Sequence, residues 1–135
     1  MTDISQDIVG DFCVVAPEMP HPQPGRLVFS GERHEGDTCV LLAVGGQASR
    51  LLPLHLAVRK HSPNGFEWGY SGSGPAQLAL ALCIEVAGRT RAERVYQVVK
   101  DALIAPIQSE SWMLSGKQVL AAIEAAERQL HQDNK

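Results

Sequence analysis

Apolar residues in the first half of the chain fall in short runs separated by glycines, prolines and polar turns, a pattern that predicts β-strands. The runs predicted as strands are 26–30, 38–44 and 54–59. In the third run Leu54, Leu56 and Val58 alternate with other residues and are expected to face inward. Pro53 keeps residues 51–52 out of a central strand, because proline has no N–H to offer the ladder.

A turn is predicted at residues 62–65, where the sequence reads Ser-Pro-Asn-Gly. Proline presets φ at the second position of a turn, and glycine accepts a positive φ at the fourth. The chain is therefore expected to return as another strand over residues 66–70, whose aromatic residues share one face and whose Glu67 lies on the other. The aromatic residues of that strand are Phe66, Trp68 and Tyr70.

The second half of the chain has the spacing of helices. The first helix is predicted to begin at Pro75 and to end at Gly88, since proline suits the first helical position and glycine suits the position after the last. Its side chains are apolar on nearly every side, so it is expected to lie at the centre of the core.

Two further helices are predicted from capping boxes, in which a Ser or Thr and a Glu or Gln three residues later satisfy each other's backbone N–H groups. One helix starts with the box of Thr90 and Glu93 and ends at Pro106. The other starts with the box of Ser115 and Gln118, with residues 112–114 leading into it. The stripe that the second helix turns inward is Ala92, Val95, Tyr96, Val99 and Leu103.

Together these elements predict an α+β fold, with a small antiparallel sheet of three to four strands from the N-terminal half packed against three helices from the C-terminal half. A single domain is expected over residues 26–131, after a Pro-rich N-terminal extension (1–25) and before a short tail (132–135). Within the extension, residues 12–16 form an apolar run that could add an edge strand.

Composition and charge narrow the class of protein. The 135 residues are 44% hydrophobic with a net charge of −3, as in an ordinary globular protein. That balance disfavours nucleic-acid binding through a basic surface. No apolar run is long enough to cross a bilayer and no signal segment is visible, so Cys13, Cys39 and Cys83 are expected to be free thiols of a cytoplasmic protein.

The charges are unevenly distributed along the chain. Residues 1–49 hold two arginines against seven acids, whereas residues 50–100 hold seven basic residues against three acids. The middle segment is therefore net basic, which bears on anions as ligands, and the first segment is acidic, which favours a basic partner surface.

The sequence GFEWGYSGSGPAQLALA over residues 65–81 resembles the signature of a small uncharacterised family of bacterial and phage or plasmid proteins. That signature reads SPxGFEWGYGGSGPAQLALA, and this chain departs from it at Ser71, where the family has glycine. The likeness spans roughly residues 26–123 and includes Tyr96, Lys100 and Trp112. Because the family has no assigned activity, the resemblance implies relatives and no mechanism.

The same stretch predicts a candidate site for an anion. The Gly/Ser loop, residues 71–74, precedes a helix N-terminus, where free backbone N–H groups attract phosphate or carboxylate. The basic pair Arg59 and Lys60 precedes the turn, and the aromatic pair Trp68 and Tyr70 could stack on a base. The alternative is a tight structural turn between a strand and a helix. The candidate ligand-binding residues are Arg59, Lys60, Glu67, Trp68, Tyr70, Ser71, Gly72, Ser73 and Gly74.

Other chemistry finds little support in the sequence. Ser71 approaches the G-x-S-x-G pattern of hydrolases, but the fifth residue is Ser73 and the only later histidine is His131. Glu67 lacks a partner acid within the motif. The histidines have no cysteine or carboxylate at ligand spacing, so neither a catalytic residue nor a metal or cofactor is predicted.

The function expected from the sequence is therefore non-enzymatic: a binding or regulatory protein of bacterial or mobile-element origin that acts through protein interaction. Trp68, Tyr70 and Arg59 are of the residue types that dominate interface energies. The alternative is binding of a small molecule or a nucleotide phosphate at the Gly/Ser loop. The sequence leaves the oligomeric state open.

Overall fold

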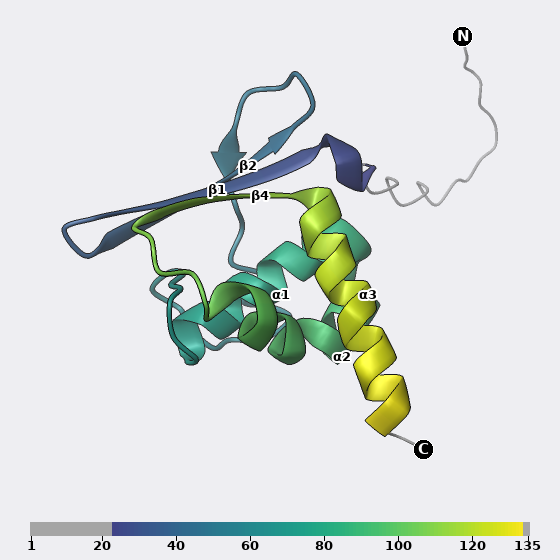
Figure 1. Ribbon diagram of the computed structural model, residues 1–135. Helices are drawn as coiled ribbons and strands as arrows, with labels where there is room; N and C mark the ends of the chain where they lie inside the picture. Colours follow the sequence, from purple (N-terminus) through teal and green to yellow (C-terminus); the bar gives the residue numbers. More distant parts are fainter. Residues whose placement is uncertain (1–22, 134–135) are drawn as a thin grey trace, which may run out of the picture.

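The structure, a computed structural model, describes residues 23–133. A four-stranded antiparallel sheet, in the order β3-β2-β1-β4, lies on one side of three helices (Figure 1). Its strands are β1 (Leu27–His34), β2 (Asp37–Val44), β3 (Arg50–Leu51) and β4 (Ser111–Ser115). The α+β prediction of a small antiparallel sheet packed against three helices is confirmed.

The β1–β2 hairpin follows the alternation of the sequence. Its inward side chains include Phe29 and Leu42, which pair across the strands and are at most 1% exposed. Glu35 and Gly36 form the turn with φ of 52° and 88°, the positive pair that matches the twist of a hairpin. The strands predicted at residues 26–30 and 38–44 are confirmed, and β1 extends further toward the turn.

The prediction of strands at 54–59 and 66–70 is wrong. Between β3 and the first helix the chain forms an irregular segment, residues 52–72, which we call the linking segment. His55 and Gly65 take positive φ values of 56° and 138°, which no regular strand contains. Leu54 and Val58 are part-buried against the core, so their alternation reflects packing of this segment and not a ladder.

The sequence also conceals β4, because residues 112–114 were expected only to lead into the last helix. The strand pairs with β1 and places Trp112 opposite Gly31. A Cβ on Gly31 would overlap the Trp112 ring, so glycine makes the room that the indole fills. The Trp112 ring meets that of Trp68 edge to face, with centroids 5.6 Å apart.

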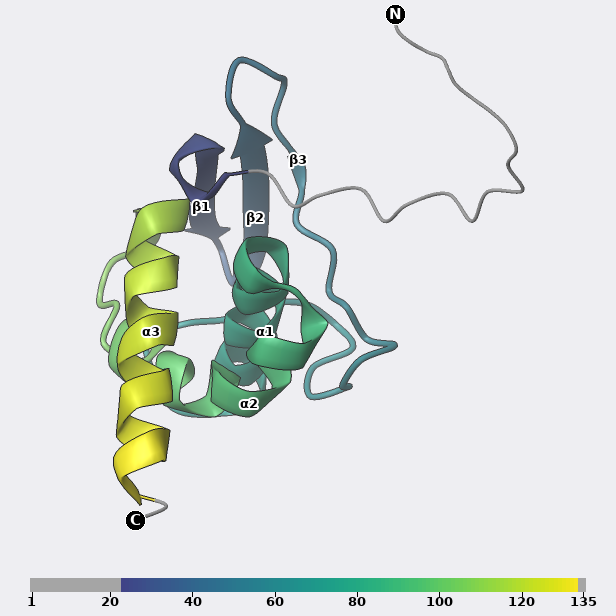
Figure 2. The same cartoon turned by 90° about the vertical axis from the view of Figure 1, so that its right-hand side faces the viewer.

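The helices are α1 (Ser73–Ala87), α2 (Arg89–Val99) and α3 (Gly116–Asp133), with a short 3-10 turn η1 (Pro24–Arg26) and a π-helical turn η2 (Lys100–Ile104). Every residue of α1 from Gly74 to Ile84 is buried, which confirms the prediction of a central helix. Figure 2 shows α1 between the sheet and α2, with α3 running alongside.

The helix ends test the predicted caps. Gly88 ends α1 with φ of 86°, as expected. Gly88 also precedes α2, which has no side-chain cap, so the predicted box of Thr90 and Glu93 is wrong. The box at α3 is confirmed: the Ser115 N–H donates to Gln118 Oε1 at 2.8 Å, and the Gln118 N–H donates to Ser115 Oγ at 3.1 Å.

The remaining expectations from the sequence concern the N-terminal extension, the cysteines and the absence of a membrane span. The possible strand at residues 12–16 and nearly all of the Pro-rich extension lie outside residues 23–133. Within that range Cys39 is exposed and Cys83 buried, and burial raises the pKa of the Cys83 thiol to about 12. None of the helices within residues 23–133 combines the length and the apolar character needed to cross a bilayer.

Candidate functional site

Gln77 of α1 anchors the linking segment to the helix, although sequence reasoning gave it no role. Its side chain is fully buried. The amide oxygen accepts from the N–H groups of His61 and Ser62 at 2.7 and 2.9 Å. The amide nitrogen donates to the carbonyls of Leu54 and Arg59 at 2.6 and 3.0 Å. All four hydrogen-bonding positions of the amide are used, so this polar side chain is satisfied in the core.

Arg33 of β1 makes a second set of contacts with the linking segment, around Glu67 and Trp68. Its guanidinium donates to Glu67 Oε1 at 2.6 Å, to the Trp68 carbonyl at 3.2 Å and to the Glu110 carboxylate. It also lies 4.5 Å from the centroid of the Trp68 ring. The bond to Glu67, and after it the bond to Glu110, raises the pKa of Arg33 above its ordinary value. Glu67 therefore has a structural partner that the sequence did not reveal.

Trp68 lies in the core and not in a binding site. Its side chain is 1% exposed, and the indole N–H donates to the Ser109 carbonyl at 2.9 Å. A base could stack on this ring only if the segment opened. Tyr70 is the exposed aromatic residue of the motif, at 51%.

The Gly/Ser loop, residues 71–74, packs closely against its own neighbours. The Tyr70 ring covers Gly72, and a Cβ on Gly74 would come within 2.6 Å of the Glu67 Cβ. Ser71 donates its hydroxyl to Asp101 Oδ1 at 3.1 Å. Asp101 thus brings a carboxylate to the loop, which opposes the attraction of the helix N-terminus for an anion.

Arg59 and Lys60 lie on the surface of the linking segment. The Arg59 guanidinium pairs with Glu93 of α2 at 3.6 Å. Among residues 23–133, neither basic side chain makes a hydrogen bond or an ion pair with residues 71–74. The structure therefore brings Glu67, Trp68 and the Gly/Ser loop together, and it shows no contact that adds the two basic residues to them.

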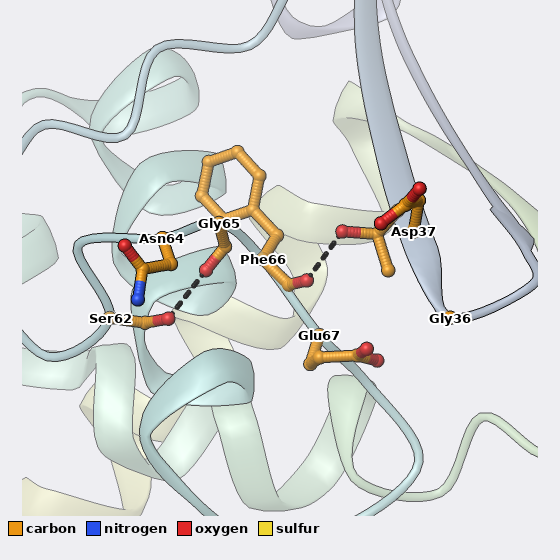
Figure 3. A pocket seen from close by; sticks show the side chains of 8 residues that line it. Gly36, Asp37, Ser62, Asn64, Gly65, Phe66 and Glu67 are labelled. Atoms are coloured by element: carbon orange, nitrogen blue, oxygen red, sulfur yellow. Dashed lines mark hydrogen bonds between the residues drawn. The ribbon is translucent and has the colours of Figure 1, made fainter.

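A polar hollow of about 380 Å³ lies between the β1–β2 turn and the linking segment (Figure 3). Thr38 and Ser62 donate their hydroxyls to the carbonyls of Phe66 and Gly65, at 2.8 and 2.6 Å. Asp37 and Glu67 both line the hollow, so its charge suits a cation better than an anion (Figure 3). The lining residues are Gly36, Asp37, Thr38, Ser62, Asn64, Gly65, Phe66 and Glu67.

Two histidines of the linking segment bond to the helices, which sequence spacing could not show. His61 Nε2 lies 2.7 Å from the Tyr96 hydroxyl, and His55 Nε2 lies 2.7 Å from Glu85 Oε2. Glu85 also faces Arg50 of β3 at 3.7 Å. These pairs join the segment to α1 and α2, and within the described residues no group of three potential metal ligands forms.

The outward side of the sheet is a second candidate surface, and its residues lie outside the motif of residues 65–81. The helices cover one side of the sheet, and the other side faces away from them (Figure 1). We call the outward residues away from the β1–β2 turn the open face. They are Val28, Ser30, Glu32, Cys39, Leu41, Ala43, Leu51, Ser111, Met113 and Ser115.

No other element covers the open face within residues 23–133, and yet it carries more apolar side chains than a solvent-exposed face ordinarily does. Met113, Leu51 and Val28 are 70%, 68% and 38% exposed. The register places Met113, Ser30, Leu41 and Leu51 in one row across the four strands. Glu32 is its only charged residue, whereas an antiparallel sheet with one solvated face ordinarily turns polar side chains outward.

A family model described as a family of unknown function, DUF6166, matches residues 29–125 of the chain. The match covers well over half of the sequence. The chain belongs to this family. No curated protein and no solved structure matches the chain.

The DUF6166 match confirms the resemblance to an uncharacterised family. It spans β1 from Phe29 to α3 at Ala125 and so includes Arg33, Gln77 and most of the open face. Because the family is described only as one of unknown function, it assigns no activity to any of these features.

Proposed function

We propose that this DUF6166 protein is a non-enzymatic binding protein that docks another protein on the open face of its sheet. The observation that carries the proposal is the row of Met113, Ser30, Leu41 and Leu51. Three of its four side chains are apolar, and it lies on a face that no helix covers within residues 23–133. Contiguous exposed apolar surface rimmed by polar groups is typical of protein interaction sites.

The charges beside the open face indicate which kind of partner surface would fit it. Glu32 lies on the face, and Glu35 and Asp37 follow at the adjoining turn. Within the described residues, Glu35 and Asp37 make no ion pair. A partner with an apolar patch flanked by lysines or arginines fits this arrangement, and it is the basic partner that the acidic N-terminal half predicts.

The aromatic residues take a different part from the one expected of them. Trp68 was expected to contact a partner, and its burial assigns it to the core instead. The binding surface proposed here consists of aliphatic side chains on strands. The bacterial or mobile-element origin and the cytoplasmic location stay expectations from the sequence. Anion binding at the Gly/Ser loop also stays a prediction, and titration with inorganic phosphate tests it.

The experiment compares proteins captured by immobilised variants. Leu51→Lys places a charge at the β3 end of the row, on a side chain that is 68% exposed, so the fold should be unaffected. Ala125→Lys adds the same charge on the exposed side of α3 and is the matched control. A partner should bind the wild type and Ala125→Lys equally well. It should bind Leu51→Lys at least tenfold more weakly, which corresponds to about 1.4 kcal/mol of binding free energy. Its association with the wild type should be slower in high salt.

Two outcomes contradict the proposal. One is a partner that binds Leu51→Lys as tightly as it binds the wild type, because the open face then contributes nothing. The other is a wild type that captures nothing beyond what Leu51→Lys captures. Thermal unfolding of each variant shows whether the fold is intact.

A further inference from the structure

The two edges of the sheet are protected to different degrees. β3 is only two residues long, contains the charged Arg50 and is soon followed by Pro53. Short length, charge and proline are devices by which proteins block an edge against further pairing. β4 has five residues, Ser-Trp-Met-Leu-Ser, with neither a charge nor a proline. The β4 edge therefore lacks each of these three devices.

The register shows which backbone groups of β4 face outward. The Arg33 N–H donates to the Glu110 carbonyl at 2.8 Å, and the pairs Gly31–Trp112 and Phe29–Leu114 continue the same register. In an antiparallel pair the backbone groups of alternate residues point to the partner strand, so those of Ser111, Met113 and Ser115 point away from β1.

Two of these outward N–H groups are already occupied. The Ser111 N–H donates to Ser109 Oγ at 3.2 Å, and the Ser115 N–H donates to Gln118 Oε1 at 2.8 Å. Met113, at the centre of the strand, makes no such bond within residues 23–133 with either its N–H or its C=O. The free donor and the free acceptor thus belong to one residue.

We propose that β4 pairs with β4 of a second copy of this chain, antiparallel and centred on Met113. A two-fold axis at Met113 lets each Met113 N–H donate to the C=O of the other copy, so the free donor and acceptor satisfy each other. Ser111 then lies opposite Ser115 of the other copy. β4 has no charged side chain, so the pairing brings no like charges together on the strand.

The dimer joins two sheets into one of eight strands, with both open faces on the same side. The ten outward residues of the open face each take about 4.8 Å across the strands and about 6.8 Å along them, which gives each open face roughly 300 Å². A stable protein interface takes about 800 Å² from each partner. One face is too small for that and two joined faces approach it, so the dimer supplies the area; this step alone depends on the proposed function.

The first test is the mass in solution. Sedimentation and light scattering should give 29.2 kDa, twice the 14.6 kDa of one chain. Met113→Pro should give 14.6 kDa, because proline removes the N–H that points outward and leaves the bonds to β1 intact. Met113→Thr retains the N–H and should remain a dimer. A wild type of 14.6 kDa at every concentration overturns the proposal, and so does a dimeric Met113→Pro.

A cross-link provides a test that needs no change in stability. Residues opposite each other in a hydrogen-bonded pair have Cα atoms about 5.5 Å apart, within the range of a disulfide. With Cys13 and Cys39 replaced by serine, Met113→Cys should form a covalent dimer on oxidation. Leu51→Cys is equally exposed, at 68% against 70%, but lies at the other edge and should not. Equal cross-linking of the two variants overturns the proposal.

The outcomes separate this inference from the proposed function. If Leu51→Lys is dimeric and binds the partner normally, the open-face proposal fails and the dimer stands. If Met113→Pro is monomeric and binds the partner as tightly as the wild type, the dimer stands and its contribution of area fails. If the wild type is monomeric and Leu51→Lys loses the partner, the dimer fails alone.

Discussion

The two faces of the sheet carry side chains of similar character and meet very different surroundings. On the inner face, which the helices cover (Figure 1), Phe29 and Leu42 are at most 1% exposed. On the open face Leu51 and Met113 are 68% and 70% exposed. An apolar side chain stabilises the fold only when it leaves water, so the inner residues account for stability and the open ones do not. The open face is therefore the surface on which we propose that a partner docks.

The largest expected effect comes from the inner face. Phe29→Ala should lower the free energy of unfolding by about 3–5 kcal/mol, because it removes a fully buried ring and leaves a cavity. Urea unfolding of the full chain measures this change. Leu41→Ala, one register position away on the open face, should cost under about 1 kcal/mol. Equal losses for the two variants would mean that the open face is covered in solution.

The next effect concerns what covers the inner face. Gln77→Leu removes the amide that binds four backbone groups of the linking segment, and it should cost about 2–3 kcal/mol because buried groups lose their partners. Amide exchange in residues 54–62 should accelerate, while exchange in the β1–β2 hairpin should change little. Gln77→Glu retains the acceptor for His61 and Ser62 but sets a buried carboxylate oxygen against the Leu54 and Arg59 carbonyls, so it should cost at least as much as Gln77→Leu. Exchange that accelerates equally in segment and hairpin would show that Gln77 supports the whole core and not this segment.

The sheet shows how far the sequence could predict the fold. The β1–β2 hairpin and the helices were predicted because alternation, helical spacing and the box at Ser115 are local signals. Residues 54–59 alternate in the same way, yet Gln77 provides their hydrogen bonds from α1, a contact that local pattern does not contain. β4 was missed because five residues before a capping box carry too weak a signal.

The candidate site was predicted less well, for a related reason. The sequence marks Glu67 and Trp68 as unusual, but Arg33 lies far away in the chain, and only folding brings it to them. Their exposure also depends on tertiary packing, so a buried indole could not be told from an interface residue. The open face depends on register, which the sequence does not specify once one strand is missed.

The smallest expected loss of stability concerns an ion pair between two helices, away from both faces of the sheet. It serves as a reference for the losses expected of Phe29→Ala and Gln77→Leu. Arg91 of α2 donates two hydrogen bonds to Glu127 of α3, at 2.9 and 2.8 Å. Arg91 lowers the pKa of Glu127 below its ordinary value. Both side chains are more than a third exposed, so water screens the pair, and Glu127→Gln should cost only about 0.5 kcal/mol at neutral pH.

The pH dependence of this loss gives the prediction its sign. A carboxylate whose pKa is lowered on folding stabilises the fold above its unfolded pKa, near 4.3 for Glu, and loses that contribution as the pH falls through the folded value. The difference in melting temperature between the wild type and Glu127→Gln should therefore be present at neutral pH and vanish in acid below the folded pKa. Glu124→Gln, an exposed neighbour on α3, should show a smaller difference at neutral pH. If the difference for Glu127→Gln persists unchanged in acid, the side chain contributes packing and not charge. If Glu127→Gln lowers the free energy of unfolding as much as Phe29→Ala does, the stability of the fold depends on contacts between its helices and not on the core beneath its sheet.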